Sequence, residues 1–572
     1  MSLSESATKP PLVFAATYNE RDNIEELCRQ VLGLPLGVSM LVVDDNSPDG
    51  TGRVLDRIAA SEPRLKVMHR PRKLGLGTAH MLAMAYAIHH RYPYLVTMDA
   101  DFSHSPADIP RLLGELERAD LVIGSRYMEG GRCDYKGYRK FLSWSANRFG
   151  KLLLGMPVHE LTTSFRAFRT SMLVDLDYAT VRSQGYTFFL ECVWQIARGK
   201  FRCREVPIHF ADRLHGRSKI PRLEVFRGIG KLLLLTARRL RGWRRWGGGA
   251  VVPKGGCPHC GAVYRVEVYP SKNQGADTKV EAYRCTSMEH GSKPQVVRCL
   301  MCGLLAAGEP ASGREILDLY REVEDPSYLR NQSSRIKTFS RILDEMANWV
   351  PERGKVLEVG AYCGVFMDCA AGRGWDIEGV EPSRWAASLA RQKGHTVHSG
   401  SLPEVSDRLK PPYQTVAMWD VFEHLSCPGE TLDEIGSLLS DDGYLLFSTL
   451  DAESRWARML GRNWPWIMDM HLLYPSVRTV STILEAHGFE IASVQPYRHY
   501  ASISYLFEKI GQIAPGGIGK PFGMIAGVLP KRLALPVYLG DVKLFVCRKI
   551  VSDGPREPVV VVNKQNIELG GS

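Results

Sequence analysis

The segment VTMDADFSHSP, residues 96–106, sets the fold class of the N-terminal half. Apolar residues at 94–98 predict a buried strand, and Asp99 and Asp101 come at its end with one residue between them. The carboxyl ends of parallel strands are where open α/β sheets bind ligands. Two carboxylates with room for a diphosphate are typical of a Mg²⁺ or Mn²⁺ site, because these ions rarely sit in a cage made only of protein.

Strand-like and helix-like segments alternate around this motif, as repeated βαβ units require. The expected strands are 12–16, 40–43, 65–69 and 121–123, and the expected helices are 23–32, 51–60 and 77–89. An acidic, turn-rich loop follows the second strand at 44–50. The pattern predicts a largely parallel sheet covered by helices, with its ligand site at the carboxyl edge.

Six motifs in order resemble the dolichol- and polyprenol-phosphate mannose synthases, which are inverting GT-A glycosyltransferases. They are ATYNERDNI (16–24), VVDDNSPDGT (42–51), RPRKLGLGTA (70–79), MDADFSH (98–104), VIGSRY (122–127) and FADRLHGRSK (210–219). The resemblance covers roughly residues 10–245. It implies transfer of a hexose, with GDP-mannose as the expected donor, to polyprenyl or dolichyl phosphate.

The chemistry of such a transfer fits these residues. A metal ion held by Asp99 and Asp101 would act as a Lewis acid on the departing diphosphate. Glycines at 75 and 77 let bare backbone approach phosphate closely. By the resemblance, the residues expected to bind the nucleotide sugar are Tyr18, Glu20, Asp45, Arg70 and Lys73.

A phosphate acceptor needs little help from a general base, because its second pKa is about 6 and it is already anionic near neutral pH. The protein must instead hold two anionic groups together, which calls for guanidinium and ammonium groups. We expect this part of the site to contain Arg126, Arg139, Arg213, Lys219 and the hydroxyl of Ser143.

The charge distribution favours a membrane surface over nucleic acid. The chain carries a net charge of +11, and residues 238–246 hold five arginines in nine positions. A leucine-rich stretch before them and two flanking tryptophans suit an anionic bilayer interface. The segment at about 223–246 is either an in-plane anchor or a core helix followed by a basic linker. No apolar run reaches the roughly 18–20 residues of a bilayer span, and the N-terminus lacks a signal-peptide pattern. We expect a cytoplasmic protein bound peripherally to membrane, with no nucleic-acid partner.

Two CxxC motifs lie between the two halves of the chain. Cys257 and Cys260 form one, and Cys299 and Cys302 form the other, with 38 residues between them. Four thiolates suit a closed, structural Zn²⁺ site. Reduced thiols or a degenerate ribbon are the alternatives. The thirteen cysteines of this long chain favour a reducing compartment over a disulfide framework.

A second set of motifs resembles the class I S-adenosylmethionine-dependent methyltransferases over about residues 256–550. They are LEVGAYCG (357–364), GVEPS (379–383), WDVFEHL (419–425) and EAHGFEI (485–491). The resemblance implies that Glu358, Gly360 and Gly364 shape the methionine side of the cofactor pocket. It places Glu381 on the adenosine ribose and Asp420 beside the cofactor. His424 and His471 are candidates to accept a proton from a sugar hydroxyl, or they are packing residues.

The chain is therefore interpreted as α/β throughout: a GT-A nucleotide-diphospho-sugar transferase domain at 1–246, a zinc-ribbon-like module at 247–310 and a Rossmann-like class I methyltransferase domain at 311–552. Residues 553–572 are expected to form a flexible tail. We expect a bifunctional transferase whose second half methylates a glycan or lipid-linked intermediate. The alternatives are glycosyl transfer to a sugar hydroxyl in capsule or lipopolysaccharide assembly, and a C-terminal half that binds S-adenosylmethionine without turnover.

Overall fold

The structure is a computed structural model of the full 572-residue chain. It describes residues 9–178, 181, 185, 187–199, 201–212, 223–240, 255–271, 284, 293–308, 313–330, 332–350, 354–507, 525 and 534–550. The chain divides into two compact units. Unit 1 comprises Met1–Gly256, Ala262–Val268 and Arg298–Gly303, and unit 2 comprises Cys257–Gly261, Tyr269–Val297 and Leu304–Ser572.

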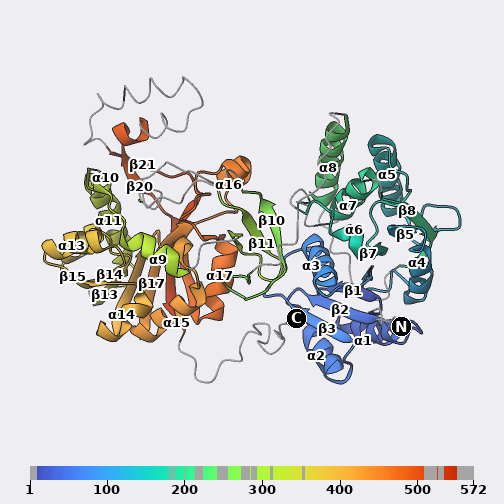
Figure 1. The fold of residues 1–572 in the computed structure, drawn as a ribbon, viewed down its shortest axis with the longest axis horizontal. Helices are drawn as coiled ribbons and strands as arrows, with labels where there is room; N and C mark the ends of the chain where they lie inside the picture. The colour runs from blue at the N-terminus through green and yellow to red at the C-terminus, as the bar shows by residue number, and fades with distance from the viewer. Residues whose placement is uncertain are drawn as a thin grey trace, which may run out of the picture. The chain divides into compact units, whose positions relative to one another are not determined.

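Unit 1 is built on a mixed sheet with the strand order β3-β2-β1-β4-β7-β5-β8 (Figure 1). Its strands are β1 (Leu12–Thr17), β2 (Ser39–Asp44), β3 (Leu65–His69), β4 (Tyr94–Asp99), β5 (Leu121–Ser125), β7 (Arg166–Arg169) and β8 (Cys203–Pro207). Strands β1 to β4 pair in parallel, whereas β7 runs antiparallel between β4 and β5. The carboxyl ends of β1, β2 and β4 therefore share one edge of the sheet.

Alternate residues of β1 pack into separate layers on the two faces of the sheet. Val13 and Ala15 belong to a core with α1 (Arg21–Leu32) and α2 (Thr51–Ser61). Phe14 faces the other way, where its ring meets His80 of α3 (Leu76–His89). Helix α3 is buried along almost its whole length, because α6 (Thr170–Leu173) and α7 (Thr187–Arg198) cover this side. The helices thus fix the sheet from both faces and leave its carboxyl edge to the loops.

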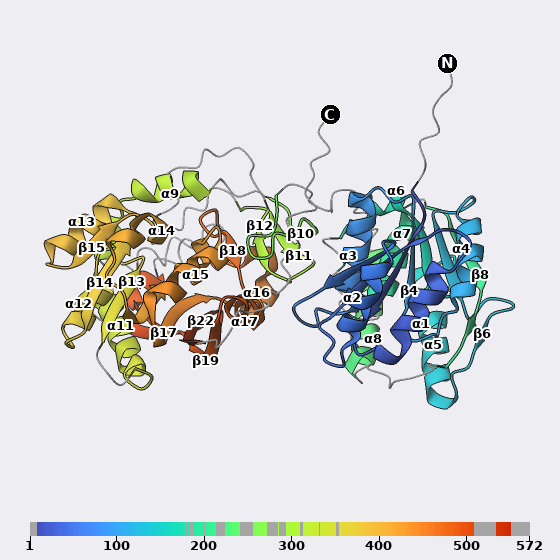
Figure 2. The ribbon, with the colours of Figure 1, turned by 90° about the horizontal axis from the view of Figure 1, so that it is seen from below.

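Unit 2 contains a second mixed sheet, with the order β15-β14-β13-β16-β17-β22-β19 (Figure 2). Its strands are β13 (Lys355–Val359), β14 (Asp376–Glu381), β15 (Thr396–Ser399), β16 (Tyr413–Trp419), β17 (Leu439–Leu450), β19 (Phe489–Pro496) and β22 (Val542–Lys549). Strands β13 to β17 are parallel, and β22 lies antiparallel between β17 and β19. The prediction of two α/β domains is confirmed.

The cysteine-bearing segment contributes three strands to a small sheet with the order β10-β11-β12-β18, whose last strand comes from much later in the chain. The strands are β10 (Arg265–Tyr269), β11 (Val296–Cys299), β12 (Leu305–Ala307) and β18 (Leu473–Tyr474). Residues 272–283 and 285–292 of the long insert lie outside the described residues. The domain limits expected from the sequence stay predictions.

The predicted basic helix is present as α8 (Leu223–Leu240), but the rest of the arginine run, 241–246, lies outside the described residues. The tail at 553–572 also lies outside them. Within the part of the chain that the structure describes, no helix is both long enough and apolar enough to cross a membrane.

Candidate active sites

The two aspartates of the opening motif lie at the carboxyl edge of the unit 1 sheet. Asp99 is the last residue of β4, and the Ser164 hydroxyl donates a 2.6 Å hydrogen bond to its Oδ1. Asp101 is buried, and its Oδ1 accepts the backbone N–H of Ser103 at 3.1 Å. The Asp99 side chain remains one quarter exposed, so one of the two carboxylates faces solvent at the edge where a ligand enters.

The buried side chain of His104 fixes the backbone of this motif. Its imidazole is fully buried, and burial lowers its pKa to about 3, so the ring is neutral. Nδ1 accepts the N–H of Asp99 at 3.1 Å, and Nε2 therefore bears the hydrogen and lies 3.1 Å from the Thr163 hydroxyl. His104 is a positioning residue for Asp99.

The donor set fits a hard divalent cation. Asp99 and Asp101 offer carboxylate oxygens from positions separated by one residue, and Ser164 and His104 orient Asp99. Mg²⁺ or Mn²⁺ bound there would supply positive charge to a departing diphosphate. The aspartates would hold such an ion, and the remaining residues at this edge orient them.

The residues expected to bind the nucleotide lie on the neighbouring loops. The ammonium group of Lys73 sits 4.1 Å from the centre of the Tyr18 ring, a cation–π contact. Arg70 is buried and pairs with Asp45, and its Nη1 donates to the Thr78 hydroxyl at 2.8 Å. The guanidinium of Arg70 therefore holds Asp45 and the Gly-rich loop together.

Glu20 follows Tyr18 by two residues and lies just before α1. Its Oε2 accepts the amide of Asn23 at 2.9 Å, and its N–H donates to the Thr51 hydroxyl at 3.0 Å. These contacts join the loop after β1 to the start of α2. The nucleotide-binding roles of Tyr18, Glu20, Asp45, Arg70 and Lys73 stay predictions.

Arg126 is already paired inside the protein. Its Nε and Nη2 donate to the two carboxylate oxygens of Glu160 at 2.8 and 3.0 Å, and Nη2 also donates to the Thr162 hydroxyl at 3.0 Å. Both members of the pair are buried. Burial alone would raise the pKa of Glu160, but Arg126 holds that pKa below its usual value. The Arg126 charge is therefore balanced locally before any phosphate arrives.

The other expected acceptor residues are only partly described. Ser143 lies on α5 (Gly137–Leu154), where its carbonyl accepts the Asn147 amide at 2.9 Å. Arg139 also lies on α5, but its side chain is outside the described residues, as are Arg213 and Lys219 entirely. Their roles stay predictions.

The loop between α5 and β7 contributes residues to the site that the sequence did not predict. Glu160, Thr163 and Ser164 come from this loop and contact Arg126, His104 and Asp99, respectively. The available signal was a run of hydroxyl-bearing residues directly before a strand. That run carries no fixed spacing, so it could not be assigned a function from the sequence alone.

The glycines of the second motif set shape a tight turn after β13 in unit 2. Gly360 has φ +79°, and a Cβ there would lie 2.6 Å from Cγ2 of Val421. Gly364 has φ +71° and precedes the first residue of α12 (Val365–Ala371). Both positions need glycine, the first because space is lacking and both because of the left-handed backbone.

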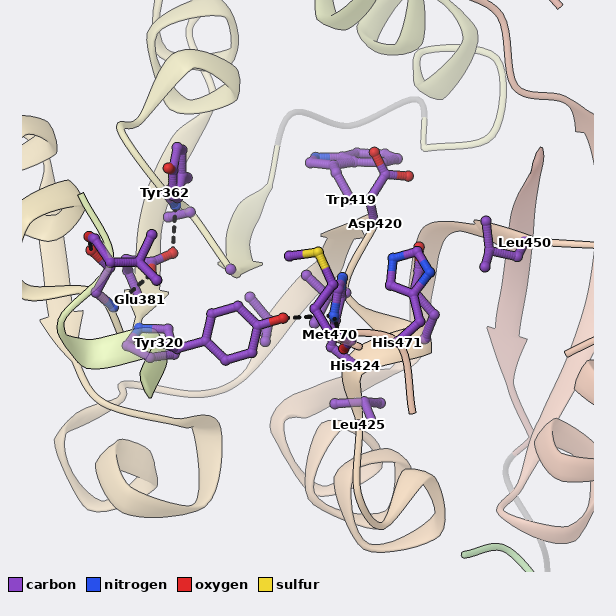
Figure 3. A pocket seen from close by; sticks show the side chains of 18 of the residues that line it. Tyr320, Tyr362, Glu381, Trp419, Asp420, His424, Leu425, Leu450, Met470 and His471 are labelled. Carbon is purple, nitrogen blue, oxygen red and sulfur yellow. Dashed lines mark hydrogen bonds between the residues drawn. The ribbon is translucent and has the colours of Figure 1, made fainter. Parts of the chain in front are cut away.

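Glu381 ends β14 and closes that turn (Figure 3). Its Oε2 accepts the N–H of Tyr362 and its Oε1 the N–H of Ser383, each at 2.7 Å. Burial raises the pKa of Glu381 to about 7. Each carboxylate oxygen has a second lone pair, so the ionised group retains acceptor capacity for two further donors.

These residues line a cavity of about 1190 Å³ in unit 2. Glu358, Gly360, Glu381 and Asp420 line it, whereas Gly364 lies at the start of α12 and is not a lining residue among those described. Glu358 is buried, and within the described residues its Oε2 has no hydrogen-bond partner. Asp420 is fixed by the Ser448 hydroxyl, which donates to its Oδ1 at 2.7 Å.

The cavity fits S-adenosylmethionine. A buried acceptor without a partner suits the ammonium group of an amino acid, and the glycine turn leaves bare backbone beside it. The carboxylate of Glu381, at the end of the second strand, suits ribose hydroxyls. Bound there, the cofactor would supply an electrophilic methyl group, and Glu358, Gly360 and Glu381 would hold and orient it.

Two histidines and one glutamate lie together in the same cavity. His424 and His471 have ring centres 4.8 Å apart (Figure 3). Glu423 is buried next to them. Burial lowers the pKa of His424, so its imidazole is neutral. Burial, and secondarily the nearby Asp420, raises the pKa of Glu423 to about 8. Glu423 was not among the residues expected to form the site.

The four cysteines of the CxxC motifs come together. Their sulfur atoms all lie within 4.8 Å of one another. Each motif closes with a backbone hydrogen bond, from Gly261 N–H to Cys257 and from Gly303 N–H to Cys299, at 2.9 and 3.0 Å. None of the cysteines that the structure describes forms a disulfide. Four clustered sulfurs suit tetrahedral Zn²⁺, whose bonds to sulfur are about 2.3 Å long.

Binding of S-adenosylmethionine should strengthen as pH rises through 7. Below its pKa of about 7 Glu381 is protonated, and above it the ionised carboxylate accepts hydrogen bonds from the ribose. The Kd is expected to be about tenfold higher at pH 6 than at pH 8, since one unit on each side of the pKa changes the ionised fraction about tenfold. Calorimetric titration at both pH values measures this. Glu381→Gln should flatten the profile, and an equally steep profile in that variant would contradict the assignment.

Two family models match the chain. Glycosyl transferase family 2 matches residues 12–176, and a methyltransferase domain matches residues 328–494. Polyprenol monophosphomannose synthase of Mycolicibacterium smegmatis is 41% identical over 216 residues, covering 37% of this chain and 82% of its own. Undecaprenyl-phosphate mannosyltransferase of Micrococcus luteus is 38% identical over 210 residues, covering 36% and 86%.

A solved structure also matches unit 2 at a low level. It is a methyltransferase from Thermotoga maritima, described as a possible histamine N-methyltransferase. It covers 37% of this chain and 99% of its own, with 19% identity and a TM-score of 0.23. A likeness at that level carries no functional argument. The sequence matches are strong enough to assign the family. The chain belongs to glycosyl transferase family 2 as a homologue of the polyprenol monophosphomannose synthases, with a methyltransferase domain in the same polypeptide.

Proposed function

We propose that unit 1 transfers mannose from GDP-mannose to a polyprenyl phosphate and that unit 2 methylates a glycan or lipid-linked sugar. The main support is the 41% identity to a relative named for polyprenol monophosphomannose synthesis, across 82% of that relative. The position of Asp99 and Asp101 at the carboxyl edge of the sheet agrees with it. We infer the methyl acceptor from the fusion of the two domains in one chain, since unit 1 produces a lipid-linked sugar in this proposal.

In this proposal unit 1 works by positioning and charge. The aspartates hold a divalent cation against the diphosphate, and the lipid phosphate attacks the sugar carbon directly because it is already anionic. The paired Arg126 and Glu160 hold the loop before β7, which carries Ser164 and with it Asp99. Arg139, Arg213 and Lys219 are then the cationic residues that we assign to the acceptor phosphate from the sequence.

The surface of unit 1 suits a membrane-bound acceptor. Helices α5 and α8 pack against each other, and Arg239 of α8 donates to the carbonyl of Leu153 at the end of α5 (Figure 1). Large apolar side chains are exposed on both helices. They are Tyr138, Phe141, Trp144, Phe149, Leu152 and Leu153 on α5 and Ile229, Leu233, Leu234 and Leu240 on α8. The α5 residues fall on one face of their helix, as in helices that lie in a bilayer interface.

Phe141→Asp should weaken binding to anionic lipid vesicles by about tenfold or more. Burying a phenylalanine side chain is worth roughly 1.5–3 kcal/mol, and 1.4 kcal/mol is a factor of ten. Co-sedimentation with phosphatidylglycerol–phosphatidylcholine vesicles measures the effect. Val174→Asp is the matched control, because Val174 is similarly exposed, 55% against 63%, and lies outside both helices. Equal losses in the two variants would argue against a docking face on α5.

The size of the unit 2 cavity supports a methyl acceptor beside the cofactor. Small-molecule sites usually enclose about 300–1,000 Å³, and this cavity is larger, at about 1190 Å³. Asp420, His424 and His471 line the part of the cavity drawn around Trp419 in Figure 3. Polar groups in that position suit the hydroxyls of a sugar.

A donor panel tests the proposed glycosyl transfer. The full-length protein is incubated with Mg²⁺, polyprenyl phosphate and labelled GDP-mannose, UDP-glucose or UDP-galactose, and the products are extracted into organic solvent. We expect label in the organic phase from GDP-mannose only. Labelled lipid from a uridine nucleotide alone would contradict the donor, and labelled soluble glycan alone would contradict the acceptor.

A further inference from the structure

Unit 2 contains a cluster of metal-ligating side chains that methyl transfer as such does not require. Glu423 and His424 belong to the short turn η4 (Phe422–His424) after β16, and His471 comes from the loop before β18. One ligand atom from each residue lies within 4.8 Å of the other two. All three residues line the cavity that holds Glu381 and Asp420.

Both imidazoles are held in the tautomer that a metal needs. Nδ1 of His424 lies 2.8 Å from the carbonyl oxygen of Met470, and Nδ1 of His471 lies 2.8 Å from that of Trp466. A carbonyl oxygen only accepts, so these contacts favour the tautomer with the hydrogen on Nδ1 and the lone pair on Nε2. In His424 the Tyr320 hydroxyl oxygen, 2.7 Å from Nδ1, then accepts from the same N–H. Histidine ligands of metals characteristically donate their other N–H to such a carbonyl.

The carboxylate is oriented in the same way. The Thr449 hydroxyl donates to Oε2 of Glu423 at 2.8 Å, and the backbone N–H of Leu472 donates to the Glu423 carbonyl at 2.9 Å. Together with the bond from His424 to Met470, these contacts tie the turn after β16 to the loop that carries His471. The three ligand groups therefore come from two segments that fix each other.

The charge of the cavity favours a cation at this position. Glu423 and Asp420 are two acidic side chains three positions apart, and both line the cavity together with the imidazoles of His424 and His471. A buried carboxylate is costly unless it is paired or coordinates a metal. Two histidines and one carboxylate form a triad that holds a divalent first-row metal and leaves coordination positions open.

We propose that Glu423, His424 and His471 bind a divalent metal ion whose open positions take a hydroxyl oxygen of the methyl acceptor. The metal lowers the pKa of that hydroxyl, which gives its proton to water. The oxygen then forms a bond to the methyl carbon of S-adenosylmethionine, the carbon–sulfur bond breaks, and its electron pair stays on sulfur. The acceptor's role rests on the proposed methyl transfer, whereas the metal site itself does not.

Manganese titration of the full-length protein tests the site without any methyl acceptor. The background variant is Asp101→Ala, which removes the metal site of unit 1, and Mn²⁺ is a hard ion that the cysteine thiolates disfavour. Unbound Mn²⁺ is read by its electron paramagnetic resonance signal. We expect one bound Mn²⁺ per chain, and His471→Asn in that background should raise the Kd more than about 100-fold, since loss of even an outer-shell partner costs about 10- to 100-fold. His487→Asn, a histidine that pairs with Asp433, is the matched control and should bind unchanged.

Thr449 supplies a second test that leaves every ligand in place. Thr449→Val removes the hydroxyl that orients Glu423 and should weaken Mn²⁺ about tenfold, whereas Thr449→Ser should restore binding. Unchanged Mn²⁺ affinity in both His471→Asn and Thr449→Val, or no bound Mn²⁺ in the background protein, would overturn the proposal. Bound Mn²⁺ without methylation of any acceptor would instead leave the metal site standing and contradict the proposed methyl transfer.

Discussion

Asp101→Asn should reduce formation of the labelled polyprenyl-phosphate sugar by at least about 100-fold. Asp101 is buried at the carboxyl edge of the unit 1 sheet and, with Asp99, offers oxygen donors that would hold the proposed divalent cation. Without the ion, the negative charge on the departing diphosphate is not stabilised, a loss of several kcal/mol, and each 1.36 kcal/mol is tenfold in rate. Extraction of labelled lipid from a timed reaction measures the effect.

The control for this prediction is Asp108→Asn. Asp108 is an acidic residue of the turn η1 (Pro106–Asp108) directly after the motif, and it pairs with Arg111 at the surface at 2.9 Å. The surface pair contributes little to stability, so lipid labelling should remain close to that of the unmodified protein. Labelling by Asp101→Asn that matches Asp108→Asn would show that this carboxylate does not serve the transfer.

Glu381→Gln should weaken S-adenosylmethionine about 10- to 100-fold at pH 8 and leave lipid labelling unchanged. Hydrogen bonds to a charged acceptor are worth roughly 1.5–3 kcal/mol, and the glutamine keeps the shape of the side chain while losing its charge. Glu381 lies in unit 2, in a different sheet from Asp99 and Asp101. Calorimetry for the cofactor and lipid extraction for the sugar give the two readouts on one preparation.

Glu378→Gln tests whether S-adenosylmethionine affinity depends only on the carboxylate at the end of β14. Glu378 lies three residues earlier on β14, where it pairs with Lys355 and accepts a hydrogen bond from Tyr413, and it does not line the cavity among the described residues. Its replacement should leave cofactor affinity within about twofold, a change of roughly 0.4 kcal/mol. Parallel losses of cofactor affinity and lipid labelling in Glu381→Gln would contradict two separable sites.

The sequence predicted the parts of the fold that depend on local periodicity. Largely apolar segments such as 94–98 and 356–359 form buried parallel strands, and α1, α2 and α3 follow the expected helical segments. The position of strand β22 in the sheet could not be predicted from local sequence. This strand inserts antiparallel between β17 and β19, although β19 precedes it by more than forty residues, and no local pattern specifies that long-range pairing.

Some site residues could likewise be predicted from the sequence, and others could not. Residues fixed by a spacing motif, such as Asp99 and Gly360, could be located from the sequence at the edge of a sheet. Residues that act through a distant partner could not: the Glu160 carboxylate pairs with Arg126 across 34 positions, and His471 meets His424 from 47 positions away. Such contacts are determined by how loops pack in three dimensions, and a single sequence holds no record of them.

We propose that a divalent cation held by Asp99 and Asp101 drives sugar transfer to a lipid phosphate. The most direct measurement uses the full-length protein, freed of loosely bound ions by gel filtration without a chelator, so that a tightly held zinc is retained. Labelled GDP-mannose and polyprenyl phosphate are then added, with or without Mg²⁺. We expect label in the organic phase only when Mg²⁺ or Mn²⁺ is present. In Asp101→Asn we expect the labelled lipid to be lost at any Mg²⁺ concentration. Equal labelling with and without the ion would contradict this proposal.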